Sequence, residues 1–198
     1  PPHTFTADST ISVDEVYLSM RDEAVTFPGT FNRPTAQGGT DITIVGESLT
    51  ITNPSDNIGT VWVLNSELKY AGTITENLTN WGTVSPGASP GTITVQGNYE
   101  QIHNTNYTGV LNIELGGTTV GTQYDQLVVT GTAAFDGTLQ VSLIDAFTST
   151  LGDSFTLMTY DSVTGEFDTV NLPELDPGRE WAIDYGDTAL TLTVVRSG

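Results

Sequence analysis

The apolar residues of this chain fall into short runs in which they alternate with polar residues, and turn-forming residues separate nearly all of these runs. Examples are Asp41–Ile51, Thr60–Leu64, Thr138–Ile144 and Ala189–Val195. In a strand every second side chain points to the same face, so this alternation is typical of strands with one buried face. Ser12–Ala24 also fits a helical spacing, but its β-branched residues favour a strand. The sequence therefore predicts an all-β fold with little helix.

The spacing of the runs indicates how the strands are connected. Between Ile42 and Tyr70 the runs recur every 7–12 residues, without the Asn-Gly turns that are typical of tight hairpins. A period of about 20 residues that contains short strands is typical of a solenoid. We therefore predict a parallel β-helix; the alternative is an antiparallel β-sandwich, above all after Asp145, where the loops lengthen. The predicted inward positions are Ile42, Ile44, Leu49, Ile51, Val61, Val63, Ile93, Val95, Leu111, Ile113, Leu127, Val129, Leu139 and Val141.

Glycines at turn positions support this organisation. Gly87 and Gly91 lie in a Pro/Gly-rich patch that we interpret as tight turns, and Gly131 and Gly137 end successive short strands. A corner with φ > 0 favours glycine, because other side chains are strained there. We predict one structural unit, with β-helix rungs in residues 1–144 and a C-terminal β-rich cap in residues 145–198. Residues 1–31 would form an N-terminal cap or a segment exchanged with another chain.

The composition restricts the partners of the chain. It carries 24 acidic and 5 basic residues, which give a net charge of −19, and it contains no cysteine. This charge repels phosphate, which argues against nucleic acid and anionic membranes, and no apolar run reaches the roughly 18 residues of a membrane span. Without cysteine there are no disulfides and no thiolate metal sites. An acidic, lysine-poor surface with 34 threonines suits an extracellular protein, although acidity also serves solubility alone.

No residue pattern in the sequence predicts catalysis. The stretch Gly87–Gly91 matches G-x-S-x-G around Ser89, but the next residue, Pro90, has no N–H for an oxyanion hole. The two histidines, His3 and His103, have no catalytic or metal-binding partner that the sequence identifies. We therefore expect no enzymatic activity.

Two kinds of binding site are considered. Aspartates in turns with Gly, Ser or Thr offer the hard oxygen ligands that Ca²⁺ prefers, although aspartate also favours turns without any metal. The Ca²⁺ candidates are Asp125, Asp136 and Asp153. Aromatic residues offer a surface on which sugars stack. Trp62 lies in an apolar strand and is predicted to be in the core, whereas Trp81 and Trp181 flank turns and are predicted to be exposed.

The segment that begins at Trp81 carries a distinctive motif. It reads Trp81-Gly-Thr-Val-Ser-Pro-Gly-Ala-Ser-Pro-Gly-Thr-Ile-Thr-Val-Gln-Gly-Asn-Tyr-Glu-Gln101, and it is followed by Gly109-Val-Leu-Asn-Ile-Glu-Leu-Gly-Gly117, Tyr124-Asp-Gln-Leu-Val-Val-Thr-Gly131, Phe135-Asp-Gly-Thr-Leu-Gln-Val141, Gly152-Asp-Ser-Phe-Thr-Leu157 and Gly165-Glu-Phe167. It resembles the autotransporter-associated β-strand repeat, S-P-G-x-S-P-G-T-L-T-V-x-G-x-Y-x-Q, of passenger domains and large bacterial surface proteins. The resemblance covers residues 81–195, and residues 9–80 resemble preceding rungs more loosely. It implies secretion, a right-handed parallel β-helix and a structural or adhesive role at a cell surface, without catalytic residues.

Apolar strands near both ends of the chain predict self-assembly. The candidate assembly residues are Ile11, Val13, Val16 and Leu18 near the N-terminus, and Leu190, Leu192 and Val194 near the C-terminus. A bare apolar strand edge is an aggregation hazard, which pairing with a strand of a second copy would relieve. Head-to-tail contacts of this kind do not close, so they generate a fibre.

The leading functional hypothesis is a non-enzymatic extracellular structural or adhesive protein, a segment or subunit of a bacterial surface fibre, sheath or adhesin. Its partners would be other copies of itself or an extracellular polysaccharide, with no nucleic acid and no membrane insertion. Its one candidate cofactor is Ca²⁺. The alternatives are a polysaccharide-binding module of a secreted protein and a β-helical polysaccharide-degrading enzyme or phage-spike fragment.

Overall fold

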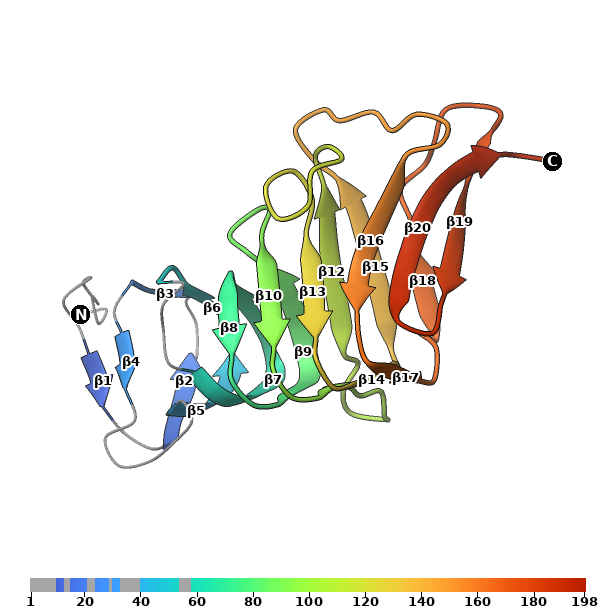
Figure 1. The fold of residues 1–198 in the computed structure, drawn as a ribbon. Coiled ribbons are helices and arrows are strands. Elements are labelled where there is room, and N and C mark those ends of the chain that lie inside the picture. The colour runs from blue at the N-terminus through green and yellow to red at the C-terminus, as the bar shows by residue number, and fades with distance from the viewer. Residues whose placement is uncertain (1–9, 13–14, 21–23, 29, 33–39, 54–57) are drawn as a thin grey trace.

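The computed structural model describes residues 10–12, 15–20, 24–28, 30–32, 40–53 and 58–198 (Figure 1). These residues form strands, turns and loops, without any helix, so the predicted all-β class is confirmed for the described part of the chain. The segment that competed for a helix contains strand β2 (Glu15–Met20). Within the described ranges, no helix is long and apolar enough to cross a membrane.

Eighteen strands belong to one continuous curled sheet, and β1 (Thr10–Ser12) and β4 (Thr30–Asn32) form a separate parallel pair. The long strands β7 (Ile58–Tyr70) and β9 (Leu78–Pro86) each bend and contribute to two rows of the sheet. The first row contains β2, β5 (Thr40–Gly46), the first parts of β7 and β9, β11 (Tyr99–Gln101), β14 (Thr132–Ala134) and β17 (Ser162–Thr164). The second row contains β3 (Val25–Phe27), β6 (Ser48–Ile51), the second parts of β7 and β9, β12 (Val110–Leu115), β15 (Thr138–Leu143) and β18 (Thr169–Asn171).

The third row contains β8 (Gly72–Ile74), β10 (Thr92–Val95), β13 (Gln126–Val129) and β16 (Ser154–Thr159). It is continued by β20 (Ala189–Arg196) and β19 (Arg179–Tyr185), and Figure 1 shows these two strands at the C-terminal end of the body. All pairs within the three rows are parallel except β16–β20 and β19–β20, which are antiparallel. Parallel pairing therefore continues past residue 144, through β17 and β18, before the antiparallel pairs begin.

The core lies inside the curl of the sheet, where the parallel register stacks apolar residues of successive strands on one another. One such ladder runs through Ile42, Val61, Leu78, Tyr99 and Ala133. All fourteen positions predicted to point inward are buried, which confirms the period-2 pattern. Each buried Val, Leu or Ile contributes roughly 1.5–3 kcal/mol relative to an exposed one, so the ladders supply most of the driving force for folding.

Two turn glycines illustrate different requirements at the corners. Gly137 has φ +60°, in the left-handed region that favours glycine. Gly131 was also predicted to need φ > 0, but it is not among the residues with positive φ. The constraint at Gly131 is steric, because a Cβ there would lie 2.7 Å from the carbonyl oxygen of Gly97 in the preceding turn. In the Pro/Gly-rich patch, Gly87 has φ +84°, whereas Gly91 packs closely against Gly87.

Candidate functional site

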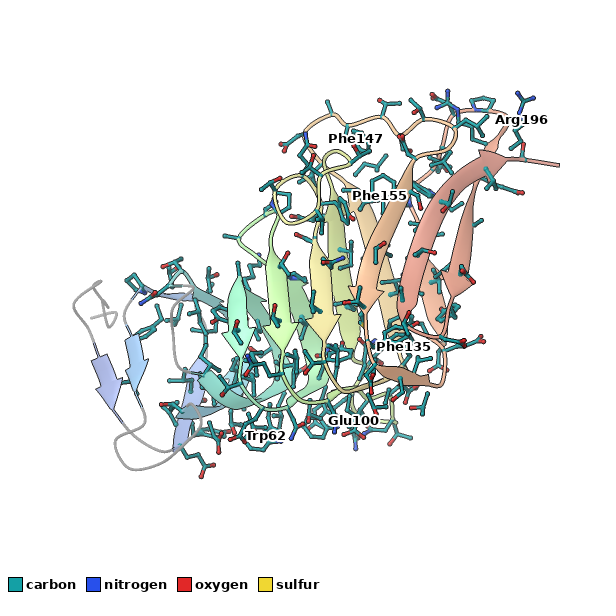
Figure 2. The ribbon with its side chains drawn as sticks, viewed as in Figure 1. Trp62, Glu100, Phe135, Phe147, Phe155 and Arg196 are labelled. Carbon is teal, nitrogen blue, oxygen red and sulfur yellow. The ribbon has the colours of Figure 1, made fainter. Side chains whose placement is uncertain are left out.

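Aromatic and hydroxyl side chains share the outward face of the first row of strands. The parallel register places Tyr17, Thr43, Trp62, Thr79 and Glu100 side by side on successive strands. Their chain neighbours point into the core, so these side chains must point outward. Figure 2 shows Trp62 and Glu100 on the same lower side of the ribbon. The prediction that Trp62 belongs to the core is wrong, because its neighbours Val61 and Val63 occupy the inward positions of β7.

The rings on this face are accessible to a ligand. Tyr17 is 65% exposed and Trp62 is half-buried. They are two strands apart, which corresponds to about 10 Å along the sheet. Trp81 is half-buried in the adjacent outward position of β9, opposite Leu64 of β7. We call Tyr17, Trp62 and Trp81, with Thr43 and Thr79 between them, the aromatic surface.

The chemistry of the aromatic surface suits a hydroxylated ligand. Aromatic rings pack against the C–H faces of sugars, while threonine hydroxyls both donate and accept hydrogen bonds. Thr79 retains only 9% exposure, since it lies between Trp62 and Glu100. Glu100 is exposed and adds an acceptor at the border of the surface.

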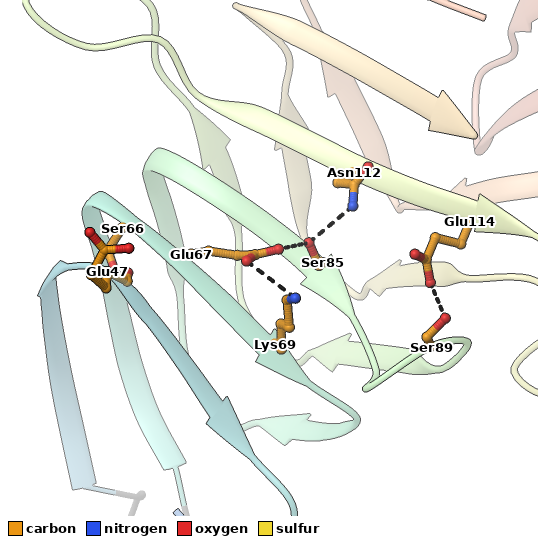
Figure 3. A network of polar contacts seen from close by, with 8 residues as sticks. All are labelled: Glu47, Ser66, Glu67, Lys69, Ser85, Ser89, Asn112 and Glu114. Carbon is orange, nitrogen blue, oxygen red and sulfur yellow. Dashed lines mark hydrogen bonds and ion pairs between the residues drawn. The ribbon is translucent and has the colours of Figure 1, made fainter. Parts of the chain in front are cut away.

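The outward face of the second row carries a connected polar network instead (Figure 3). Ser85 Oγ donates to Glu67 Oε1 at 2.8 Å, and Asn112 Nδ2 donates to Ser85 Oγ at 3.3 Å. Lys69 Nζ lies 3.4 Å from Glu67 Oε2. The same row continues to Gln140, whose Oε1 accepts from Asn171 Nδ2 at 3.1 Å. The single lysine of the chain is thus ion-paired with Glu67.

Ser89, at the centre of the G-x-S-x-G match, lies beside this network. Its hydroxyl donates to the Glu114 carboxylate, and both residues line a small cavity together with Lys69 and Ser85. Ser89 has φ +108°, and the residue after it, Pro90, has no N–H. The arrangement therefore lacks the donor that an oxyanion hole needs at this position.

The three Ca²⁺ candidates lie in separate turns, and their carboxylates bind backbone N–H groups. Asp125 is buried; its Oδ1 accepts from Gly91 N at 2.7 Å and its Oδ2 from Glu114 N at 2.8 Å. Burial raises the pKa of Asp125 to about 7, although these two N–H donors oppose the rise. Asp125 thus links Gly91, the residue before β10, to Glu114 in β12.

The other two candidates have similar local roles. Asp136 accepts from the backbone N–H of His103 at 3.0 Å and from that of Gly137 at 2.8 Å. Asp153 accepts from Thr150 N at 2.6 Å within its own loop. In the part of the chain that the structure describes, no group of three or more potential metal-binding side chains comes together.

A buried polar network that sequence reasoning missed lies at one corner of the core. Asn80, Tyr99 and Gln101 are all fully or almost fully buried. Tyr99 OH donates to Gln101 Oε1 at 2.6 Å, and Asn80 Nδ2 contacts Tyr99 OH at 3.2 Å. Gln101 Nε2 donates to the carbonyls of Gly109 at 3.0 Å and Asp136 at 2.7 Å. The Tyr-x-Gln end of the repeat-like motif was the available signal.

The remaining aromatic and histidine candidates are placed as follows. Trp181 is half-buried, packs edge-on against Phe155, and donates from Nε1 to the carbonyl of Pro173 at 2.8 Å. It is therefore held within the C-terminal end rather than presented to a ligand. His103 is exposed, and its Nδ1 lies 3.0 Å from Thr108 Oγ1 in an exposed loop.

The predicted assembly residues occupy two different environments. Leu190, Leu192 and Val194 are buried in β20, which pairs with β16 on one side and β19 on the other. They are thus unavailable as a bare strand edge. Near the N-terminus, Ile11, Val16 and Leu18 are partly buried against the core, and Val13 lies outside the described residues.

Comparison with known proteins adds no family: no family model matches the chain, and no curated protein matches it either.

Proposed function

We propose that the chain is a non-enzymatic structural or adhesive segment of an extracellular bacterial surface protein, built as a right-handed parallel β-helix with a C-terminal β-rich cap. The observation that carries the proposal is the parallel register of the three rows, in which partners in the first row are 17–34 residues apart. Parallel crossovers are right-handed in nearly all proteins, which supports the proposed hand. The resemblance of the motif in residues 81–101 supports the surface role.

The proposal includes head-to-tail assembly by strand addition. Among the described strands, β17, β18 and β19 each pair on one side only, with β14, β15 and β20, so three strand edges are available at the C-terminal end. Glu180 and Asp184 of β19 are exposed, and a charged edge opposes pairing between copies of a chain with net charge −19. Assembly should therefore increase with salt or divalent cations, which screen this repulsion.

The test is light scattering with negative-stain microscopy across ionic strength, with and without Ca²⁺. We expect filaments or growing particles at high salt, and the double variant Glu180→Gln/Asp184→Asn should assemble at lower salt than the native chain. The double variant Glu47→Gln/Asp145→Asn removes the same charge at exposed positions away from these edges and serves as the control. If the chain stays monomeric under every condition, assembly into a fibre is excluded and the proposal is reduced to a monomeric adhesive segment.

The aromatic surface favours a second candidate function, a polysaccharide-binding module. It presents rings and hydroxyls along a ladder from Tyr17 to Glu100 in which Glu100 is the one charged residue, and Glu15 and Asp41 lie two positions away on the same face. A neutral polysaccharide fits this chemistry, whereas an acidic one would be repelled by the net charge.

Affinity-gel electrophoresis with neutral polysaccharides tests this second function. We expect retardation of the native chain and its loss in Trp62→Ala and Tyr17→Ala. Tyr107→Ala removes another exposed ring, in the loop near His103, and should leave retardation unchanged. Equal migration of all four proteins with and without polysaccharide would exclude binding by this surface.

A further inference from the structure

Three consecutive turns of the sheet carry long loops at the same corner, between the second and third rows. These loops are residues 116–125, 144–153 and 172–178, and Figure 1 shows them together at the upper edge of the C-terminal half. Earlier connections at this corner are short: one residue joins β7 to β8, and residues 87–91 join β9 to β10. Loops held by a rigid framework are where binding sites concentrate in proteins.

A cavity of about 320 Å³ lies between the second and third of these loops. Its apolar lining consists of Leu143, Phe147 and Leu175, all half-buried. The exposed residues Glu174 and Asp176 also line it. This volume is at the lower end of the range of about 300–1,000 Å³ for small-molecule sites.

Ser149, in the wall of this cavity, carries an unsatisfied polar group. Its side chain is 1% exposed, and its Oγ is the one buried side-chain N or O atom of the described residues without a hydrogen-bond partner. Arg179 Nη1 donates to the Ser149 carbonyl at 2.7 Å and lies 3.5 Å from Asp176 Oδ2, so it links both loops. A buried hydroxyl without a partner is costly, and native proteins rarely keep one unless it has a use.

We propose that this cavity binds one sugar residue of a neutral glycan. The apolar lining would pack against the C–H face of the sugar, and the Glu174 and Asp176 carboxylates would accept hydrogen bonds from its hydroxyls. Ser149 Oγ would gain its missing partner after a change of rotamer. The two carboxylates repel an anionic sugar. A cationic sugar is disfavoured as well, because Arg179 already pairs with Asp176 and only the Glu174 carboxylate is left to attract it. The proposal is independent of the aromatic surface and of assembly.

The site is tested by titrating ¹⁵N-labelled protein with methyl glycosides of glucose, galactose and mannose, and with N-acetylglucosamine. Galacturonate and glucosamine serve as the anionic and cationic comparisons. We expect at least one neutral sugar to shift amide signals of residues 143–149 and 172–179 in a saturable manner. Three results would overturn the proposal: no saturable shift in these loops, shifts there with a charged sugar only, or shifts confined to the aromatic surface. The last result would support the second function while removing this site.

Ser149→Ala separates a binding role from a structural one. Removal of an unsatisfied hydroxyl should leave the melting temperature unchanged or raise it. The same change should weaken sugar binding by about tenfold, the effect of one lost ligand hydrogen bond. Ser154→Ala is the matched control, because Ser154 is exposed on β16 and its hydroxyl pairs with Thr193 Oγ1. Unchanged affinity in Ser149→Ala would refute the role assigned to its hydroxyl.

Discussion

The middle turns of the sheet and its C-terminal end use different side chains for the same task of covering the core. Between Leu78 and Leu115 the inward residues are mainly aliphatic and stack on equivalent residues of the next strand. At the C-terminal end, rings gather instead: Phe155 packs edge-on with Tyr124 at 5.4 Å and with Trp181 at 6.0 Å between ring centres. Phe135 and Phe167 stack at 4.7 Å.

This difference follows from where the stack of strands ends. A middle residue is covered on both sides by the neighbouring strands, so a small aliphatic side chain suffices. The last strands have no equivalent residue beyond them, and large rings together with the antiparallel β19–β20 pair cover the exposed end. The aliphatic ladder and the aromatic end can therefore be perturbed separately.

The largest effect is expected from Phe155→Ala at the aromatic end. Phe155 is fully buried, and the substitution should lower the free energy of unfolding by about 3–5 kcal/mol, measured by urea denaturation. Tyr107→Ala, an exposed ring, should change it by less than about 0.5 kcal/mol. A loss for Phe155→Ala as small as that of the control would show that the rings do not hold the C-terminal end.

Gln101→Ala tests the polar corner of the middle turns. The change removes the acceptor of the Tyr99 hydroxyl and one donor from each of the carbonyls of Gly109 and Asp136, although Gly109 still accepts from Thr138 N. Unpaired buried groups of this kind should cost about 2–4 kcal/mol in urea denaturation. Glu100→Ala, at the exposed neighbouring position, is the control and should be nearly neutral. Similar stabilities of the two variants would mean that water replaces the lost contacts.

Substitutions at two glycines with positive φ, one in each region, distinguish the cost of backbone strain from that of steric crowding. Gly137, with φ +60°, would place a Cβ against the carbonyl oxygen of Gly109, whereas Gly178, with φ +83°, has open space around it. Gly137→Ala should cost about 2–3 kcal/mol and Gly178→Ala about 1 kcal/mol, because the second substitution meets backbone strain alone. Thermal denaturation of both variants gives the comparison. Equal losses would indicate that crowding contributes little.

The last comparison concerns pH and Asp125, whose pKa burial raises to about 7. An unfolded aspartate titrates near pH 3.9, so between about pH 4 and pH 7 the folded chain keeps a proton that the unfolded chain has released. The contribution of Asp125 to stability is therefore full below about pH 4 and declines as pH rises through 7. Asp125→Asn should remove this decline from the pH dependence of urea midpoints, while Asp153→Asn should preserve it. Parallel pH curves for the native chain and Asp125→Asn would contradict the assignment.

The alternation of apolar and polar residues was sufficient to predict the all-β class and the inward positions. The reason is local: in a strand the side-chain direction follows from the parity of the position, so Ile42, Val61 and Leu111 could be assigned without knowledge of their neighbours. The same rule should have placed Trp62 outward, since Val61 and Val63 flank it. The large apolar ring favours burial at this residue, but strand parity decides its direction and so places it on the aromatic surface.

Other features depend on which strands become neighbours, and the sequence alone does not determine this. The sequence places Asp125 in a turn, and only the tertiary structure brings Gly91 N and Glu114 N to its two oxygens. The sequence predicted that β20 is an exposed edge strand, but in the tertiary structure β20 lies between β16 and β19 and pairs with both. Strand parity is a property of adjacent residues, whereas partners of a carboxylate or a strand edge come from residues tens of positions away. The sequence by itself therefore determined which side chains enter the core, and only the tertiary structure decided what the remaining side chains contact.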